Sequence, residues 1–205
     1  MTRDSESLDP EADLRALCEA QRWSDATTLV MQRHGRELLT YVVAIARSET
    51  DGSEAFSQFT EDLWRGLPRF RWQSSVRTWC YTLARNALFR VRRKARRAGL
   101  AIALSDAPEL ERAAEQVRSA TITYLRTQVK DEVAALREQL SPEDQAILIL
   151  RVDRKLGWTD VARALADEGE ELSDAELKRR SATLRKRFGR IKAELKRLLA
   201  PHLGE

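Results

Sequence analysis

The stretch EAFSQFTEDLWRGLPRFRWQSSVRTWCYTLARNALFRVRR, residues 54–93, carries the clearest helical pattern in the chain. Its apolar side chains recur every three or four residues, which is the spacing of one face of an α-helix. The pattern predicts a helix over 53–66 that ends before Pro68, a short connector at 70–75, and a helix over 76–97. The side chains expected to face inward are Phe56, Phe59 and Leu63 in the first helix and Val76, Trp79, Leu83, Ala87 and Val91 in the second.

The flanking sequence predicts more helices and no strands. Gly and Pro account for only 8 and 5 of the 205 residues, which is too few to punctuate a β fold. We expect a short helix over 14–21, a long helix from an N-cap at Ser24 to about 47, and a turn at 48–53. Later helices are expected to begin at Ser141, Thr159 and Ser173, the first of them with Pro142 in its first turn.

The expected fold class is therefore all-α, with two helical domains joined by a flexible linker. Residues 99–138 begin with small side chains and Pro108, and continue with a weaker helical pattern. We interpret them as a linker between a domain over 1–98 and a domain over 139–205.

Charge is distributed in blocks, although the net charge is only +4. Residues 65–99 contain eleven basic and no acidic side chains, and residues 177–199 contain ten basic and one acidic. The blocks over 1–64 and 140–176 are acidic. Two basic blocks are typical of a protein that contacts a polyanion at two places. The alternative is two solvated basic faces without a ligand.

Several function classes find no support. No run of about 18 uncharged apolar residues occurs, and residues 1–13 lack the basic start and apolar core of a secretion signal. Cys18 and Cys80 lie outside any CxxC pair, so we expect a reduced, cytoplasmic location. His34 and His202 are isolated, and no catalytic triad, phosphate-binding glycine loop or metal-spaced cluster occurs. We therefore expect no enzyme activity, no cofactor and no membrane insertion.

A series of short motifs runs through residues 54–97. An acidic helix with Gln58 is followed by Trp64-Arg65, LPRFR at 67–71, Ser74-Ser75, Arg77-Thr78-Trp79, Ala84-Arg85-Asn86 and a basic run at 90–97. In order and spacing they resemble the second conserved region of bacterial RNA polymerase sigma factors, especially the small extracytoplasmic-function (ECF) type. Residues 140–165 and 184–199 resemble the helix-turn-helix of the family's fourth region. A longer, acidic segment at 166–180 replaces its usual short turn.

The resemblance implies a sigma factor that binds core RNA polymerase and directs promoter recognition, promoter melting and transcription initiation. It also allows an anti-sigma partner. The polymerase would bind the acidic helix through Glu54, Gln58, Glu61 and Asp62. The downstream promoter element would be bound and melted by Arg71, Trp72, Arg77, Trp79, Tyr81, Arg85 and Asn86. The upstream element would be bound by Arg179, Arg180, Arg185, Lys186, Arg187 and Arg190.

These residue types suit the implied roles. Stacking on an aromatic ring holds an unpaired base by about 1–3 kcal/mol, and arginines hold phosphates while a polar side chain such as Asn86 reads the base. A basic helix in the major groove can pair with guanine edges. The competing interpretation is packing, which the apolar stripe favours for Trp79, whereas the polar connector favours exposure of Trp72.

Two other functions stay open. A helix-turn-helix regulator that binds duplex DNA without polymerase would explain the second basic block but not the aromatic-rich first block. An antagonist that mimics part of a sigma factor would explain the helices but needs no basic surfaces. DNA binding with and without core polymerase discriminates among them.

Overall fold

The computed structural model describes residues 9–96, 108–127 and 137–200, and its regular elements in these ranges are all helical. The all-α prediction is therefore confirmed. The elements are α1 (Ala12–Glu19), α2 (Trp23–Ala46), α3 (Glu49–Gly66), the 3-10 turn η1 (Leu67–Arg69), α4 (Val76–Arg96), α5 (Pro108–Thr127), α7 (Pro142–Leu148), the π-helical turn η2 (Ile149–Asp153), α8 (Trp158–Ala164) and α9 (Asp174–Leu199). Among these helices, none has the length and apolar character needed to cross a bilayer.

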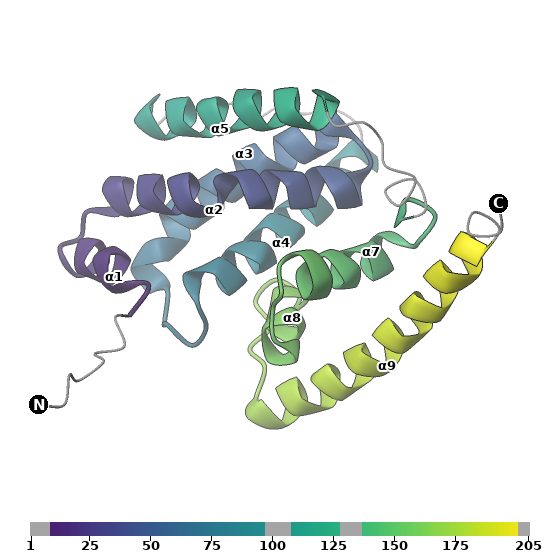
Figure 1. The fold of residues 1–205 in the computed structure, drawn as a ribbon. Helices are drawn as coiled ribbons and strands as arrows, with labels where there is room; N and C mark the ends of the chain where they lie inside the picture. The colour runs from purple at the N-terminus through teal and green to yellow at the C-terminus, as the bar shows by residue number, and fades with distance from the viewer. Residues whose placement is uncertain (1–8, 97–107, 128–136, 201–205) are drawn as a thin grey trace, which may run out of the picture.

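The helices form two groups that touch each other. Helices α2, α3 and α4 pack together, and α5 covers α2 and α3 on the side away from α7, α8 and α9 (Figure 1). Helix α7 contacts α2, and α8 contacts α4. The long helix α9 packs on α7 and α8 and lies farthest from α5 (Figure 1).

The hydrophobic core continues from the first group into the second. Phe56, Phe59 and Leu63 of α3 are fully buried, as their spacing predicts. The same apolar cluster includes side chains from α7 to α8, namely Ala146, Ile149, Leu150, Leu156, Val161 and Ala164. A smaller cluster of Leu140, Ile147, Leu148 and Ile191 holds α9 against α7. Because the first cluster spans both groups, they are packed together and not merely tethered.

Part of the predicted linker between the two domains is a packed helix. Within the predicted linker, α5 is a packed helix against α2 and α3. At Gly35 of α2 a Cβ would lie 3.0 Å from Val117 of α5, so the glycine lets the two helices approach closely. The start of the predicted linker, 99–107, lies outside the described residues. The two-domain division stays a prediction.

Helix starts were predicted correctly at some positions and wrongly at others. Ser141 and Ser173 are N-caps, and Ser173 forms a capping box with Glu176. The N-cap predicted at Ser24 is wrong, because α2 begins one residue earlier, at Trp23, without a side-chain cap. The cap predicted at Thr159 is also wrong, since α8 begins at Trp158 after Gly157.

The turn predicted at 48–53 is helical instead. Ser48 caps α3 by accepting a 3.1 Å hydrogen bond from the backbone N–H of Asp51. Gly52 is required by packing, because a Cβ there would lie 2.6 Å from Cγ2 and 2.8 Å from Cα of Val43 in α2. The composition of this segment suggested a turn, but its glycine serves a close contact between two helices.

Candidate nucleic-acid interface

Helix α4 carries most of the first basic block and is covered on more than one side. Its predicted stripe is buried at Val76, Ala87 and Val91, whereas Trp79 and Leu83 are only half-buried. Tyr81 and Leu88, on other faces of the helix, are buried as well. The additional burial arises because α2 and α3 pack on one side of α4 and α8 packs on another.

An aromatic cluster lies at the start of α4. The rings of Phe70 and Trp79 stack with centroids 4.5 Å apart, and Trp72 contacts Phe70 edge-on at 4.9 Å. Trp72 adopts a left-handed backbone conformation with φ of 56°, which costs a non-glycine residue about 1–3 kcal/mol. The guanidinium of Arg15 in α1 lies 4.0 Å from the centre of the Trp72 ring. The connector is therefore held in a fixed shape that leaves Trp72 half-exposed.

Tyr81 and Asn86 are enclosed. Tyr81 has 0% exposure and meets Tyr41 of α2 edge-on, with ring centroids 5.1 Å apart. Burial raises the pKa of both phenols, and neither hydroxyl has a hydrogen-bond partner among the described residues. Asn86 is 7% exposed. The predicted base contact of Tyr81 thus has no exposed atom to make it in this conformation, and Tyr81 is a packing residue here.

Arg77 is engaged in an ion pair with α2. Its Nε and Nη2 donate to the two carboxylate oxygens of Glu37 at 2.7 and 2.8 Å, and its Nη1 donates to the Arg154 carbonyl at 3.2 Å. Burial raises the pKa of Glu37, but hydrogen bonds from Arg77 and His34 outweigh it and lower that pKa to about 2. Arg77 therefore fastens α4 to α2 and to the segment after η2. Sequence reasoning missed Glu37, because its partner lies 40 residues away.

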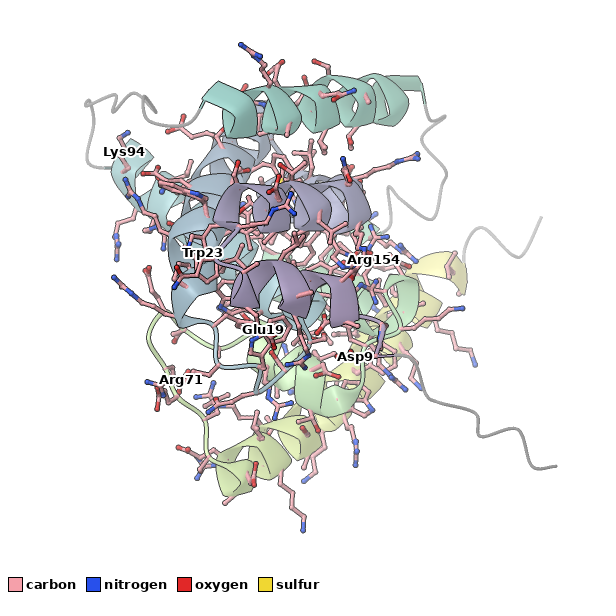
Figure 2. All side chains as sticks on the ribbon, turned by 90° about the vertical axis from the view of Figure 1, so that its left-hand side faces the viewer. Asp9, Glu19, Trp23, Arg71, Lys94 and Arg154 are labelled. Atoms are coloured by element: carbon pink, nitrogen blue, oxygen red, sulfur yellow. The ribbon has the colours of Figure 1, made fainter. Side chains whose placement is uncertain are left out.

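Other cations of this region meet an acidic loop, which we define as residues 166–173 between α8 and α9. Arg85 Nη1 donates to the Ala166 carbonyl at 3.2 Å, and Arg71 forms a 2.9 Å ion pair with Glu171. Figure 2 shows Arg71 beside this loop. Arg90 contacts both Glu168 of the loop and Asp62 of α3. The unusual acidity of the segment was visible in the sequence, but its partners were not.

The predicted polymerase-binding residues lie together on α3. Gln58 Nε2 donates to Glu61 at 3.4 Å and to Asp62 at 3.3 Å, while Glu54 lies 3.9 Å from Lys94 of α4. Burial raises the pKa of Asp62, and the charge of Arg90 opposes that rise. Asp62 is thus partly an internal partner of α4, whereas Glu54 is exposed.

The six predicted DNA-binding residues of α9 differ in whether they form ion pairs within the chain. Arg187 forms a 2.6 Å ion pair with Asp144 of α7, and Arg180 pairs with Glu170 of the acidic loop. These two flank the apolar face of α9 and are used within the chain. Of the six predicted DNA-binding residues, the exposed ones that form no ion pair with the residues that the structure describes are Arg179, Arg185, Lys186 and Arg190.

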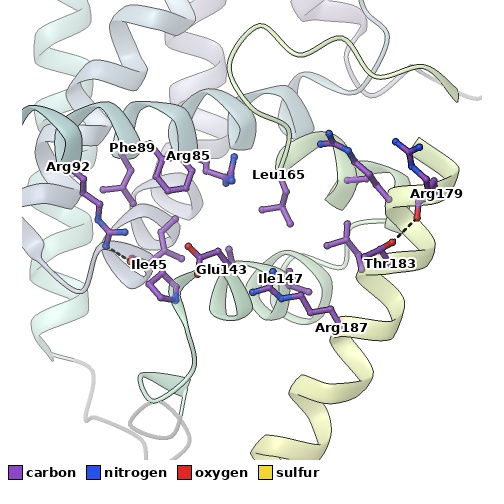
Figure 3. A pocket seen from close by; sticks show the side chains of 16 residues that line it. Ile45, Arg85, Phe89, Arg92, Glu143, Ile147, Leu165, Arg179, Thr183 and Arg187 are labelled. Carbon is purple, nitrogen blue, oxygen red and sulfur yellow. Dashed lines mark hydrogen bonds between the residues drawn. The ribbon is translucent and has the colours of Figure 1, made fainter. Parts of the chain in front are cut away.

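A cavity of about 330 Å³ lies between α4 and the helices α7 to α9. Figure 3 shows Arg85, Phe89 and Arg92 on one side of it and Arg179 and Thr183 on the other. Its walls also include apolar side chains such as Leu88, Ile147, Leu165 and Leu184. The two groups of helices therefore meet through a continuous core at one part of their contact and leave a gap at another.

Part of the chain matches a known protein family. Residues 30–98, about a third of the sequence, match the family model of sigma-70 region 2. The matched segment contains most of α2, all of α3, all of α4 and the aromatic connector, which is the connector at 70–75 with its rings Phe70 and Trp72. No curated protein and no solved structure matches the chain. The match supports a region 2 of the sigma-70 type in this protein.

Proposed function

We propose that the chain is a sigma factor of the small ECF type that binds core RNA polymerase and directs promoter recognition, melting and transcription initiation. The observation that carries this proposal is the match of residues 30–98 to sigma-70 region 2. The matched segment contains the aromatic connector and the arginines of α4, which suit a melted DNA strand.

In this proposal α3 binds the polymerase. Its polar residues Glu54, Gln58 and Glu61, two of them acidic, form one contiguous face, since helical positions three and four apart are neighbours. The exposed carboxylate of Glu54 is available to a cationic protein surface, whereas the Glu61 carboxylate already pairs with Arg65 at 2.6 Å and would have to exchange that partner. Asp62 contributes less directly, because it already contacts Arg90.

The connector and α4 bind the melted strand. Trp72 lies in the connector with a half-exposed ring, and Arg71 and Arg85 lie on either side of it along the chain. Phosphate contacts by arginine would position the strand while a base stacks on the ring. We propose that Asn86 reads a base only after the chain rearranges on binding, because it is 7% exposed in the free protein.

Helices α8 and α9 serve as a helix-turn-helix with an extended turn. Trp158 of α8 and Phe188 of α9 meet edge-on at 5.4 Å, which fixes one helix against the other. The exposed cations Arg179, Lys186 and Arg190 recur at i, i+7 and i+11, so they share one face of α9. We propose that this face enters the major groove of the upstream element.

A cytoplasmic location follows from the same proposal, which also allows an anti-sigma partner. Initiation takes place where the polymerase and the chromosome are, and a reduced compartment suits the two free cysteines, Cys18 and Cys80. The proposal includes no catalytic role and no cofactor.

Transcription in vitro tests the proposal. Core polymerase, the chain and a library of genomic fragments should yield transcripts whose starts share two upstream elements, and no such transcripts without the chain. If the chain binds specific duplex sites alone and adds no starts with polymerase, it is a conventional helix-turn-helix regulator instead.

A further inference from the structure

The acidic loop contacts the first basic block at three places. Glu171 pairs with Arg71 at 2.9 Å, Arg85 donates to the Ala166 carbonyl at 3.2 Å and lies 3.5 Å from Asp167, and Glu168 contacts Arg90. Next to the loop, the Thr82 hydroxyl of α4 donates to the carbonyl of Arg163 in α8 at 3.1 Å. The loop therefore follows the basic surface from the connector to the distal part of α4.

Hydrogen bonds within the loop give it a defined turn. The backbone N–H of Glu170 donates to the Asp167 carbonyl at 3.1 Å, and the Glu170 carboxylate accepts from the N–H of Asp167 at 3.2 Å. Gly169 has a φ of 77°, a conformation that side chains rarely adopt. Glu170 also pairs with Arg180 of α9, so this one carboxylate anchors the loop to its own helix.

The three carboxylates that reach the connector and α4 stay largely in water. The side chains of Asp167, Glu168 and Glu171 are 81%, 63% and 80% exposed. Ion pairs this exposed are individually weak and are screened by salt. Such contacts contribute little to the stability of the fold, and another polyanion can replace them.

We propose that the acidic loop is an internal competitor for nucleic acid, which occupies the cationic surface of the connector and α4 in the free chain. This inference rests on the proposed function, because Arg71 and Arg85 are the arginines assigned there to the melted strand. A tethered competitor acts at a high effective concentration even when each contact is weak. The free chain therefore holds single-stranded DNA poorly until the loop leaves α4.

The test compares two variants with the same change in net charge. The first neutralises the loop carboxylates that reach the connector and α4, as Asp167→Asn, Glu168→Gln and Glu171→Gln. The matched control neutralises three exposed carboxylates elsewhere in the chain, as Glu19→Gln, Asp25→Asn and Glu138→Gln. Affinity for a fluorescent single-stranded oligonucleotide is measured by anisotropy without polymerase, at about 0.15 M salt.

The loop variant should bind the oligonucleotide roughly tenfold more tightly than the parent, as expected for three weak ion pairs removed together. The control should bind within about threefold of the parent, through net charge alone. Equal affinities of the loop variant and the control would overturn the inference. If the triple variant fails to fold by circular dichroism, Glu171→Gln alone should still tighten binding about twofold relative to Glu138→Gln.

Promoter opening by the parent with core polymerase is measured in parallel. Opening by the parent, combined with no gain by the loop variant over the control, would remove the loop inference and leave the proposed function standing. A gain by the loop variant without any opening would remove the sigma function and retain the loop as a competitor for nucleic acid.

Discussion

Replacing Glu37 by Gln should destabilise the protein by about 3 kcal/mol at neutral pH. Glu37 lies between Arg77 and His34, its side chain is 18% exposed, and its pKa falls from an ordinary value of 4.5 to about 2. A carboxyl pKa lowered to this extent corresponds to about 3 kcal/mol of folding free energy when the group is ionised. The cost of breaking a buried ion pair by removing one partner is of similar size, about 3–5 kcal/mol.

The pH dependence has a defined sign. Because the pKa of Glu37 is lower in the folded chain, its contribution is fully present above about pH 4.5 and is lost as the pH falls toward 2. The difference in unfolding free energy between the parent and the Glu37→Gln variant should therefore shrink over this range.

Urea unfolding followed by circular dichroism, at pH 7 and at steps from pH 5 to pH 3, measures this difference. Glu19→Gln, at an exposed position of α1, is the control and should leave stability within about 0.5 kcal/mol of the parent. A loss below about 1 kcal/mol for Glu37→Gln at pH 7 would refute the fastening role of the pair. Arg77 would then be better described as a free cation available to DNA.

Three further changes test other parts of the account. Glu54→Lys with Glu61→Lys should weaken binding to core polymerase about tenfold or more without loss of helical content, because like charges then face each other across the contact; an unchanged pull-down would move the contact elsewhere. Lys186→Ala with Arg190→Ala should reduce the salt slope of duplex promoter binding by about one per lost phosphate contact, and an unaltered slope and affinity would exclude this face of α9. Gly52→Ala should destabilise the protein despite a helix-propensity gain of about 1 kcal/mol, since its Cβ would lie 2.6 Å from Val43, and a thermal midpoint at or above that of the parent would contradict this packing.

Helix starts could be predicted from the sequence where a single capping side chain determines them. Ser141 with Pro142 and Ser173 with Glu176 begin helices because their side chains satisfy free backbone N–H groups within three residues. Prediction from the local sequence failed where a contact with another helix determines which residue is needed. The sequence predicted a turn at Gly52, yet this residue lies inside α3. It is a glycine there because Val43 of α2 occupies the space that a side chain would need.

The residue types of the candidate site could be predicted from the sequence, but the side chains that pair with them could not. The motif series located α3, the connector and α4, since helical periodicity and motif spacing are local properties. Glu37 with Arg77 and Glu171 with Arg71 are 40 and 100 residues apart, and no local pattern connects such pairs. The burial of Tyr81 has the same origin, because packing on several sides of α4 hides residues outside its apolar stripe.

The central claim is that this chain makes polymerase open a promoter, and permanganate footprinting of thymines on a duplex template tests it most directly. With core polymerase and the parent chain, thymines just upstream of the mapped start should become reactive, and they should stay protected when either component is omitted. Trp72→Ala should reduce this reactivity on the duplex and recover transcription in part on a pre-melted template, because stacking of about 1–3 kcal/mol per base no longer offsets unstacking. Protected thymines with the complete parent mixture, together with specific duplex binding by the chain alone, would contradict the account.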